Sequence, residues 1–193
     1  MDIGLVKDRR PFEHRIGLTP GAVRVLCERG HRIWLEDGAG VEAGFDNEAY
    51  ERVGATVVYS TEEVYKRSHL ICKVNTPSLD EIDEMEPGQT ICTFAHLAPA
   101  SKARVDKLLS KEVSIFAYEM LADSRGRRPL LRAMSELDGR LVPQIAAQML
   151  QSPPGRGLLM SGIPGLPPAE VCILGAGEVG FNAARNFAGM GAQ

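Results

Sequence analysis

The chain has 193 residues, of which 44% are hydrophobic and 24% are charged, and its formal net charge at pH 7 is −3. This composition is typical of a globular protein with room for one core and part of a second, and the small net charge gives no reason to expect a nucleic-acid or membrane partner. The sequence shows neither a signal peptide nor an apolar run of membrane-spanning length, so we expect a cytoplasmic location.

Short apolar runs alternate with amphipathic segments over the first part of the chain. Such alternation predicts an α/β fold in which helices wrap a mostly parallel sheet. No glycine-rich fingerprint follows the first run, so this part is not itself an obvious nucleotide-binding domain. The expected strands are residues 3–6, 31–36, 56–59, 70–74, 90–94 and 113–118.

Helix signals stand between these runs. A Ser, Thr, Asp or Asn side chain at a helix start can accept a hydrogen bond from a free backbone N–H group. Pro20 suits the first turn of a helix, and Gly30 is expected to end that helix. The residues that we expect to cap four helices are, in chain order, Thr19, Asp46 or Asn47, Thr61 and Ser101.

A long amphipathic segment covers residues 134–150, where apolar residues recur on one helical face. Pro143 lies inside it and predicts a bend, because proline lacks a backbone donor. Residues 152–168 are rich in proline and glycine, which predicts an ordered connecting loop. We therefore expect a first domain over residues 1–130, and a second over 131–193 that begins with this helix.

A glycine fingerprint follows the apolar run 171–174, which we expect to form a buried strand, and precedes an expected helix. The first glycine permits a tight turn, the second lets a pyrophosphate approach bare backbone, and the third allows close helix packing. The pattern predicts a dinucleotide site at a helix N-terminus, against the alternative of a structural turn. It comprises Gly175, Ala176, Gly177, Glu178, Val179 and Gly180.

The acidic residue that would bind the adenosine ribose is expected about 20 residues beyond the fingerprint. That position lies past Gln193, so the sequence leaves the choice between NAD and NADP open and suggests a piece of a longer protein.

Cysteine and histidine spacing gives no metal signature. The four cysteines show no CxxC pairing, and we expect them to be reduced core residues in one helix and three strands. The four histidines are scattered, so no metal site is expected. The cysteines are Cys27, Cys72, Cys92 and Cys172.

Three polar side chains follow or end expected strands, where ligands of open α/β sheets collect. Arg15 offers a planar fork for a carboxylate, or is a solvated loop residue. Lys73 lies in an apolar strand and needs a partner, either a structural carboxylate or a substrate anion. His96 can move a proton near neutral pH, or is a hydrogen-bonded structural histidine.

Together these stretches resemble the N-terminal half of the alanine dehydrogenases, within the family that also contains the proton-translocating nicotinamide nucleotide transhydrogenases. The resemblance covers essentially the whole chain. The segments that carry it are residues 15–20, 38–40, 73–74, 96–98, 118–119, 129–131, 134–136, 139–140 and 162–180.

The resemblance implies a Rossmann-like, doubly wound substrate domain followed by the start of an NAD-binding Rossmann domain, and a homo-oligomer. Arg15 and Lys73 would hold the carboxylate and carbonyl oxygen of pyruvate, and His96 would act as acid and base. Ser135 would line the cofactor cleft, although it could also be a helix cap. The implied reaction is the reversible NAD-dependent oxidation of L-alanine to pyruvate and ammonia.

Two alternatives stay open. One is the nucleotide-binding subunit of a transhydrogenase, towards which Asn75 and the acidic stretch 80–86 lean. The other is a non-catalytic truncated homologue. A catalytic aspartate of alanine dehydrogenases comes from a later part of the protein, so we expect the chain alone to have little or no activity.

Overall fold

A computed structural model describes every residue of the chain except residue 154. The chain folds as two compact units, Met1–Leu121 and Ala122–Gln193. The domain boundary expected near residue 130 falls shortly inside the second unit and stays a prediction. None of the helices in the described residues is long and apolar enough to cross a membrane.

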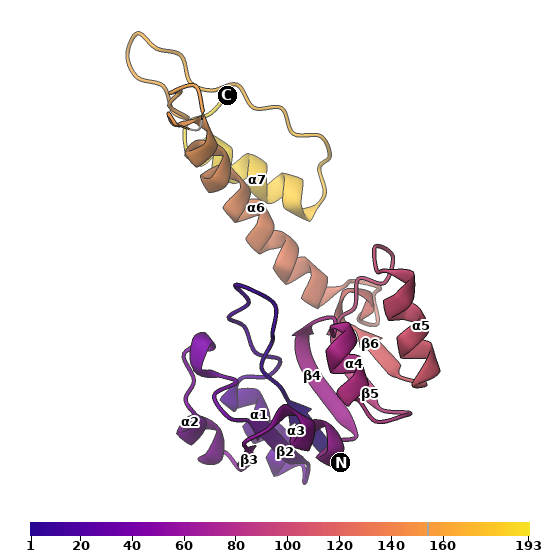
Figure 1. Cartoon of the computed structure of the whole chain (residues 1–193). Helices are drawn as coiled ribbons and strands as arrows, with labels where there is room; N and C mark the ends of the chain where they lie inside the picture. The colour runs from indigo at the N-terminus through magenta and orange to yellow at the C-terminus, as the bar shows by residue number, and fades with distance from the viewer. Residues whose placement is uncertain (154) are drawn as a thin grey trace. The chain divides into compact units, whose positions relative to one another are not determined.

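The first unit is built on a six-stranded parallel sheet with the strand order β3-β2-β1-β4-β5-β6 (Figure 1). Each strand lies within a few residues of its predicted range, so the expected α/β sheet is confirmed. The strands are β1 Asp2–Leu5, β2 Arg32–Glu36, β3 Ala55–Val58, β4 Leu70–Asn75, β5 Thr90–Phe94 and β6 Ser114–Ala117.

Helices cover both faces of this sheet, which confirms the doubly wound architecture. One buried cluster joins β1 and β2 to Val23 of α1 and Tyr50 of α2. The other joins β4 and β5 to Val64 of α3, Ile82 of α4 and Leu108 of α5. The helices are α1 Pro20–Glu28, α2 Asn47–Glu51, α3 Thr61–Arg67, α4 Leu79–Glu84 and α5 Lys102–Ser110, with short 3-10 turns η1 Val41–Ala43 and η2 Tyr118–Met120.

The predicted helix caps are partly confirmed. The side chains of Asp46 and Ser101 accept the expected backbone hydrogen bonds. Thr61 is the wrong cap, because Ser60 takes that place and accepts from the backbone of Glu63. Thr61 instead donates its hydroxyl to Glu36 at 2.6 Å.

Two further predictions need correction, one about a helix cap and one about a helix that the sequence patterns did not reveal. Thr19 precedes α1 in extended backbone but makes no side-chain cap bond. Helix α4 was not predicted at all, although Ser78 and Glu81 form a reciprocal capping box at its start. Gly30 ends α1 with a φ of 82°, as expected of a glycine there.

The second unit consists of two packed helices and connecting segments. Helix α6 spans Pro129–Leu150 and so begins earlier than predicted, because proline suits its first turn. Helix α7 spans Glu178–Gly189. A Cβ atom on Gly139 of α6 would lie 2.6 Å from Asn182 of α7, so only glycine permits this close approach.

Helix α6 continues through Pro143 without interruption. Whether the helix bends there remains a prediction. The described residues of the expected connecting loop over 152–168 form no helix. Residue 154 of this loop lies outside the described residues.

The apolar run 171–174 does not form the predicted strand. It has no β-partner, and Leu174 is 95% exposed. A strand requires a neighbour to pair its backbone, and the described residues of this unit provide none beyond an isolated bridge at 163 and 166. Cys172 is therefore exposed, not a core residue as expected.

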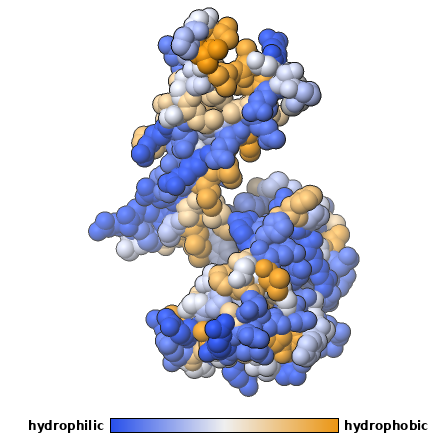
Figure 2. All heavy atoms as spheres, turned by 90° about the vertical axis from the view of Figure 1, so that its left-hand side faces the viewer, coloured by the Kyte–Doolittle hydropathy of each residue, from blue (hydrophilic) through white to orange (hydrophobic). Residues whose placement is uncertain are grey.

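Hydrophobic side chains remain exposed over this second unit (Figure 2). Its buried cluster is small and centres on Met160, Ala183 and Phe187. Exposed large hydrophobic residues lie along α6 and the segments around it, and include Leu137, Leu141, Ile145, Met149, Leu158, Leu159, Ile163, Leu166 and Phe181.

Candidate functional site

A pocket opens at the carboxyl edge of the first unit's sheet, where the strand order reverses between β1 and β4. Ligands of doubly wound sheets bind at such a switch point. Its volume of about 720 Å³ lies in the usual range for ligand pockets. Loops after β1, β4 and β5 supply most of its lining, and helices α4 and α5 each add one residue. The lining comprises Asp8, Arg9, Arg10, Pro11, Asn75, Thr76, Ser78, Glu81, His96, Pro99, Ala100 and Arg104.

His96 lines this pocket just after the end of β5. It has a φ of 42°, and its backbone N–H donates to Glu119 at 2.7 Å. Its exposed imidazole stacks on Phe94 with 6.0 Å between the ring centroids. The anchored backbone and the aromatic neighbour hold the ring at the pocket, where it can exchange protons with a ligand.

Glu119 fixes this turn through both of its carboxylate oxygens, which accept from the backbone N–H groups of Ala95 and His96. Burial opposes ionisation, but these and other backbone donors hold the pKa of Glu119 below its ordinary value. The carboxylate therefore stays charged and maintains the strained backbone of His96.

Lys73 is almost completely buried and forms an ion pair with Glu81, whose side chain is equally buried. Of the two partners considered from the sequence, the structural carboxylate is the one present. Glu81 also accepts from the backbone of Ser78 at 2.8 Å and lines the pocket. Lys73 is therefore connected to the pocket through Glu81.

Arg15 lies on the loop after β1, as predicted, and its Nε and Nη2 atoms each donate to Glu13 at 2.7 Å. Glu13 also accepts from the side chain of Asn75, which lines the pocket, at 2.7 Å. The hydrogen bond from Arg15 is the main reason that the pKa of Glu13 falls to about 2. The guanidinium is thus oriented by a carboxylate that is charged at neutral pH.

Gly17 holds this arginine loop against β4. A Cβ atom at Gly17 would lie 2.5 Å from the carbonyl oxygen of Cys72 and 3.0 Å from the nitrogen of Lys73. Backbone contact at this distance excludes any other residue. The structure thus places Arg15 and His96 on the loops after β1 and β5, and Lys73 within β4 between them. Of the three, only His96 lines the pocket, whereas Arg15 is connected to it through Glu13 and Asn75.

Sequence reasoning missed the carboxylates that fix these groups. Glu81 could have been found, because Ser78 and Glu81 have the spacing of a capping box. No local pattern distinguishes Glu13 or Glu119 from solvated surface carboxylates. The described residues contain no cluster of three or more His, Cys, Asp or Glu side chains that could hold a metal ion.

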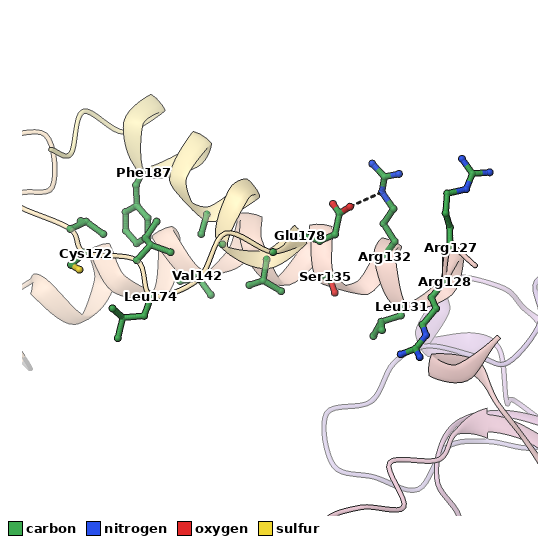
Figure 3. A pocket seen from close by; sticks show the side chains of 17 residues that line it. Arg127, Arg128, Leu131, Arg132, Ser135, Val142, Cys172, Leu174, Glu178 and Phe187 are labelled. Atoms are coloured by element: carbon green, nitrogen blue, oxygen red, sulfur yellow. Dashed lines mark ion pairs between the residues drawn. The ribbon is translucent and has the colours of Figure 1, made fainter. Parts of the chain in front are cut away.

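A second pocket lies within the second unit, around the glycine fingerprint (Figure 3), and has a volume of about 900 Å³. Gly175 has a φ of 106°, which disfavours any side chain. A Cβ atom on Gly180 would clash with the carbonyl oxygen of Gly175, whereas one on Gly177 meets open space. The three glycines therefore allow a turn, leave bare backbone exposed and permit close packing.

Helix α7 begins at Gly177 without any side-chain cap, so its first backbone N–H groups remain available. Available donors and the helix dipole suit a phosphate group. The residues present therefore fit the pyrophosphate of a dinucleotide.

Helix α6 supplies the opposite wall of this second pocket. Ser135 lines it and is not a cap, because α6 begins before it at Pro129. Arg132 reaches Glu178 of α7 at 3.4 Å (Figure 3). Arg127 and Arg128 also line the pocket, and no sequence pattern pointed to these arginines.

The family model described as "Alanine dehydrogenase/PNT, N-terminal domain" matches residues 4–138, and the model of the corresponding C-terminal domain matches residues 142–193. Alanine dehydrogenases from Mycolicibacterium smegmatis and Bacillus subtilis are each 40% identical to the whole chain. The chain covers 52% and 50% of these proteins, about half of their length.

Solved structures show the same likeness. An L-alanine dehydrogenase superposes on the whole chain with a TM-score of 0.89 and 39% identity, over 53% of its own length. A transhydrogenase from Sinorhizobium meliloti gives a TM-score of 0.79 at 24% identity, over 57% of its length, and so shares the fold.

Proposed function

The chain belongs to the alanine dehydrogenase/PNT family, and on this premise we propose that it is the N-terminal part of an NAD-dependent alanine dehydrogenase. The reaction would convert L-alanine reversibly to pyruvate and ammonia. The observation that carries the proposal is the pocket at the switch point, where the loops bearing Arg15 and His96 flank the end of β4. A homo-oligomer and a cytoplasmic location are further parts of the proposal.

In this proposal the first unit binds the small acid. Arg15 presents a guanidinium that Glu13 already orients, which suits it to a substrate carboxylate. Lys73 contributes a positive charge beside the pocket and would polarise the carbonyl oxygen, with Glu81 holding the ammonium in place. Orienting a three-carbon acid in this way lowers the entropic part of the barrier.

His96 would move the protons that the reaction requires. Alanine oxidation passes through an imine and a carbinolamine, so protons must leave the amine and an attacking water. An imidazole nitrogen of His96 at the pocket wall can accept and return them, while Glu119 and Phe94 keep the ring in position.

The second unit would hold NAD, whose nicotinamide accepts the hydride when the cofactor is bound. The backbone N–H groups at the start of α7 would bind its pyrophosphate over Gly177. Ser135 and Arg128 line the same pocket and would contact the cofactor.

We call Arg15 and Lys73, the two cations proposed to hold the substrate, the substrate clamp. It is tested by titrating pyruvate into the chain in a calorimeter. Arg15→Ala removes the guanidinium from a loop that Gly17 still holds, so we expect binding to weaken by about tenfold or more. Arg29→Ala removes another exposed arginine, at the end of α1, and is the matched control. Pyruvate binding that is unchanged in Arg15→Ala would contradict the proposal and favour a transhydrogenase subunit or a non-catalytic homologue.

The proposed pyrophosphate site at the start of α7 is tested by substituting one glycine at each end of this helix. Gly177→Ala fits the folded chain but adds a methyl group above the helix start, so we expect weaker NAD binding with unchanged thermal stability. Gly189→Ala, the same change at the other end of α7, is the control. NMR of the α7 amides during a titration with NAD measures the affinity of each variant. Equal NAD affinity in the two variants would contradict the assignment.

The chain alone is expected to produce little or no NADH from alanine. Its second unit holds helices but, among the described residues, no sheet on which a complete nucleotide fold could position the nicotinamide. Alanine-dependent NADH formation by the purified chain would contradict this expectation.

A further inference from the structure

The pocket at the switch point carries more positive charge than the proposed clamp uses. Arg9, Arg10 and Arg104 all line it, together with the carboxylates of Asp8 and Glu81, and none of the three arginines belongs to the clamp. Its volume of about 720 Å³ also exceeds what a three-carbon acid fills. Part of the pocket is therefore available to another chemical group.

Two of these arginines already have partners. Arg9 donates to Thr61 at 2.8 Å, and Arg10 donates to Asn75 at 3.1 Å. Arg104, in contrast, has a buried Nε atom with no hydrogen-bond partner among the described residues. A buried guanidinium N–H without an acceptor is costly, so an acceptor placed beside it would be bound favourably.

A second unsatisfied atom lines the same pocket. The hydroxyl of Thr76 is buried and has no hydrogen-bond partner in the described part of the chain. Thr76 comes from the loop after β4, whereas Arg104 comes from α5, after the loop that carries His96. Thr76 and Arg104 thus line one cavity from neighbouring elements, and each has an unsatisfied polar atom among the described residues.

A guanidinium and a hydroxyl together suit an oxyanion. The methyl group of alanine would satisfy neither of them. We propose that Arg104 and Thr76 form an oxyanion subsite beside His96, which binds a second acidic group in addition to the substrate's own α-carboxylate. The inference rests on the proposed function, because Arg15 and His96 define the reacting end of the substrate.

This oxyanion has two sources, which the experiment separates. It is the distal carboxylate of a dicarboxylic 2-oxo acid, in which case the substrate class includes acidic amino acids. Alternatively it is a free small anion bound next to a monocarboxylic substrate.

The first arm compares acids of equal chain length in the calorimeter. Oxaloacetate is paired with 2-oxobutanoate, and 2-oxoglutarate with 2-oxopentanoate, so that each pair differs in a carboxylate against a methyl group. We expect at least one dicarboxylate to bind about tenfold more tightly than its partner. Arg104→Met, which keeps an apolar stem, should bring this ratio close to one, and Thr76→Val should lower it by a smaller factor.

Arg29→Met is the matched control, because it removes a positive charge from the end of α1 and should retain the ratio. The second arm titrates inorganic phosphate. Phosphate binding that Arg104→Met abolishes, and that does not displace pyruvate, assigns the subsite to a free anion. A dicarboxylate preference without phosphate binding assigns it to the substrate.

The inference is overturned when the wild-type chain shows neither a dicarboxylate preference nor phosphate binding, or when both survive in Arg104→Met. Pyruvate binding that depends on Arg15 would then still support the proposed function. Conversely, phosphate binding that depends on Arg104, in a chain that does not bind pyruvate, would retain the subsite and reject the proposed function.

Discussion

The chain contains two apolar runs with the same local signals and different outcomes. Residues 70–75 form the central strand β4, paired on both sides by β1 and β5. Residues 171–174 have a similar composition but remain unpaired, with Leu174 95% exposed and Ile71 fully buried. Composition thus makes a strand possible, whereas neighbouring backbone and covering helices make it form.

The same contrast holds for charged groups. In the first unit, the buried charges of Lys73 and Glu81 satisfy one another. In the second unit the polar groups at the start of α7 remain open. The buried pair beside the first pocket is therefore in place before a ligand arrives, whereas the start of α7 offers backbone donors that a ligand would satisfy.

The largest expected effect comes from breaking the buried pair. Glu81→Ala should destabilise the first unit by about 3–5 kcal/mol, because it leaves the buried ammonium of Lys73 uncompensated. Urea unfolding followed by the fluorescence of Trp34, the chain's single tryptophan, measures this change. Asp106→Ala, which breaks an exposed pair with Lys102, should cost less than about 1 kcal/mol. Equal losses of stability in Glu81→Ala and Asp106→Ala would contradict the difference between the buried and the exposed ion pair.

The second effect compares the two apolar runs directly by amide hydrogen exchange. We expect the amides of Ile71 and Cys72 to exchange at least about a hundredfold more slowly than those of residues 172–174, because only the former lie in a paired strand. Val171 is left out, since its N–H donates to the carbonyl of Gln193. Equal protection in a dilute monomer would show that the second run has a partner.

The third effect places the same substitution in both units. Gly4→Ala should destabilise the chain by about 1–3 kcal/mol, because its Cβ would lie 2.5 Å from Ser68 and 2.6 Å from Val64. Gly189→Ala meets no atom within 4 Å and should stabilise α7 by about 0.5 kcal/mol. Thermal unfolding of both variants measures the difference, and a change of the same sign in both would contradict the packing contrast.

The smallest effect is a pH dependence of the first unit. The pKa of Glu13 is lowered from 4.5 to about 2, so its ionised form contributes stability above pH 4.5 that is lost as the pH falls towards 2. We expect a loss of about 1 kcal/mol, since half-exposed Arg15 is screened by water. Glu13→Gln should remove this part of the profile, whereas Glu51→Gln should retain it.

Much of the first unit followed from the sequence because its signals are local. Alternating apolar runs, Gly30 and the caps at Asp46 and Ser101 each act within a few residues, and the structure confirms them. Helix α4 was missed because it is short and acidic, so it carries little hydrophobic periodicity. Its capping box was the available signal.

The candidate site was predicted only in part. The positions of Arg15 and His96 at the carboxyl edge follow from the parallel sheet. Their partners Glu13 and Glu119 do not, because a carboxylate shows no preference in sequence for the group it binds. Likewise, Arg104 became a candidate only when the structure showed its Nε atom buried without an acceptor.

By itself the sequence determined the hydrophobic periodicity that favours a helix or a strand in each segment. It also determined the glycines that permit turns and close approach, and the residue types able to do the chemistry. These properties depend on neighbouring residues and on backbone conformation. The tertiary structure decided which apolar run became a strand and which carboxylate met which cation. Pairing and burial bring together groups that are distant along the chain, and their energies depend on that proximity.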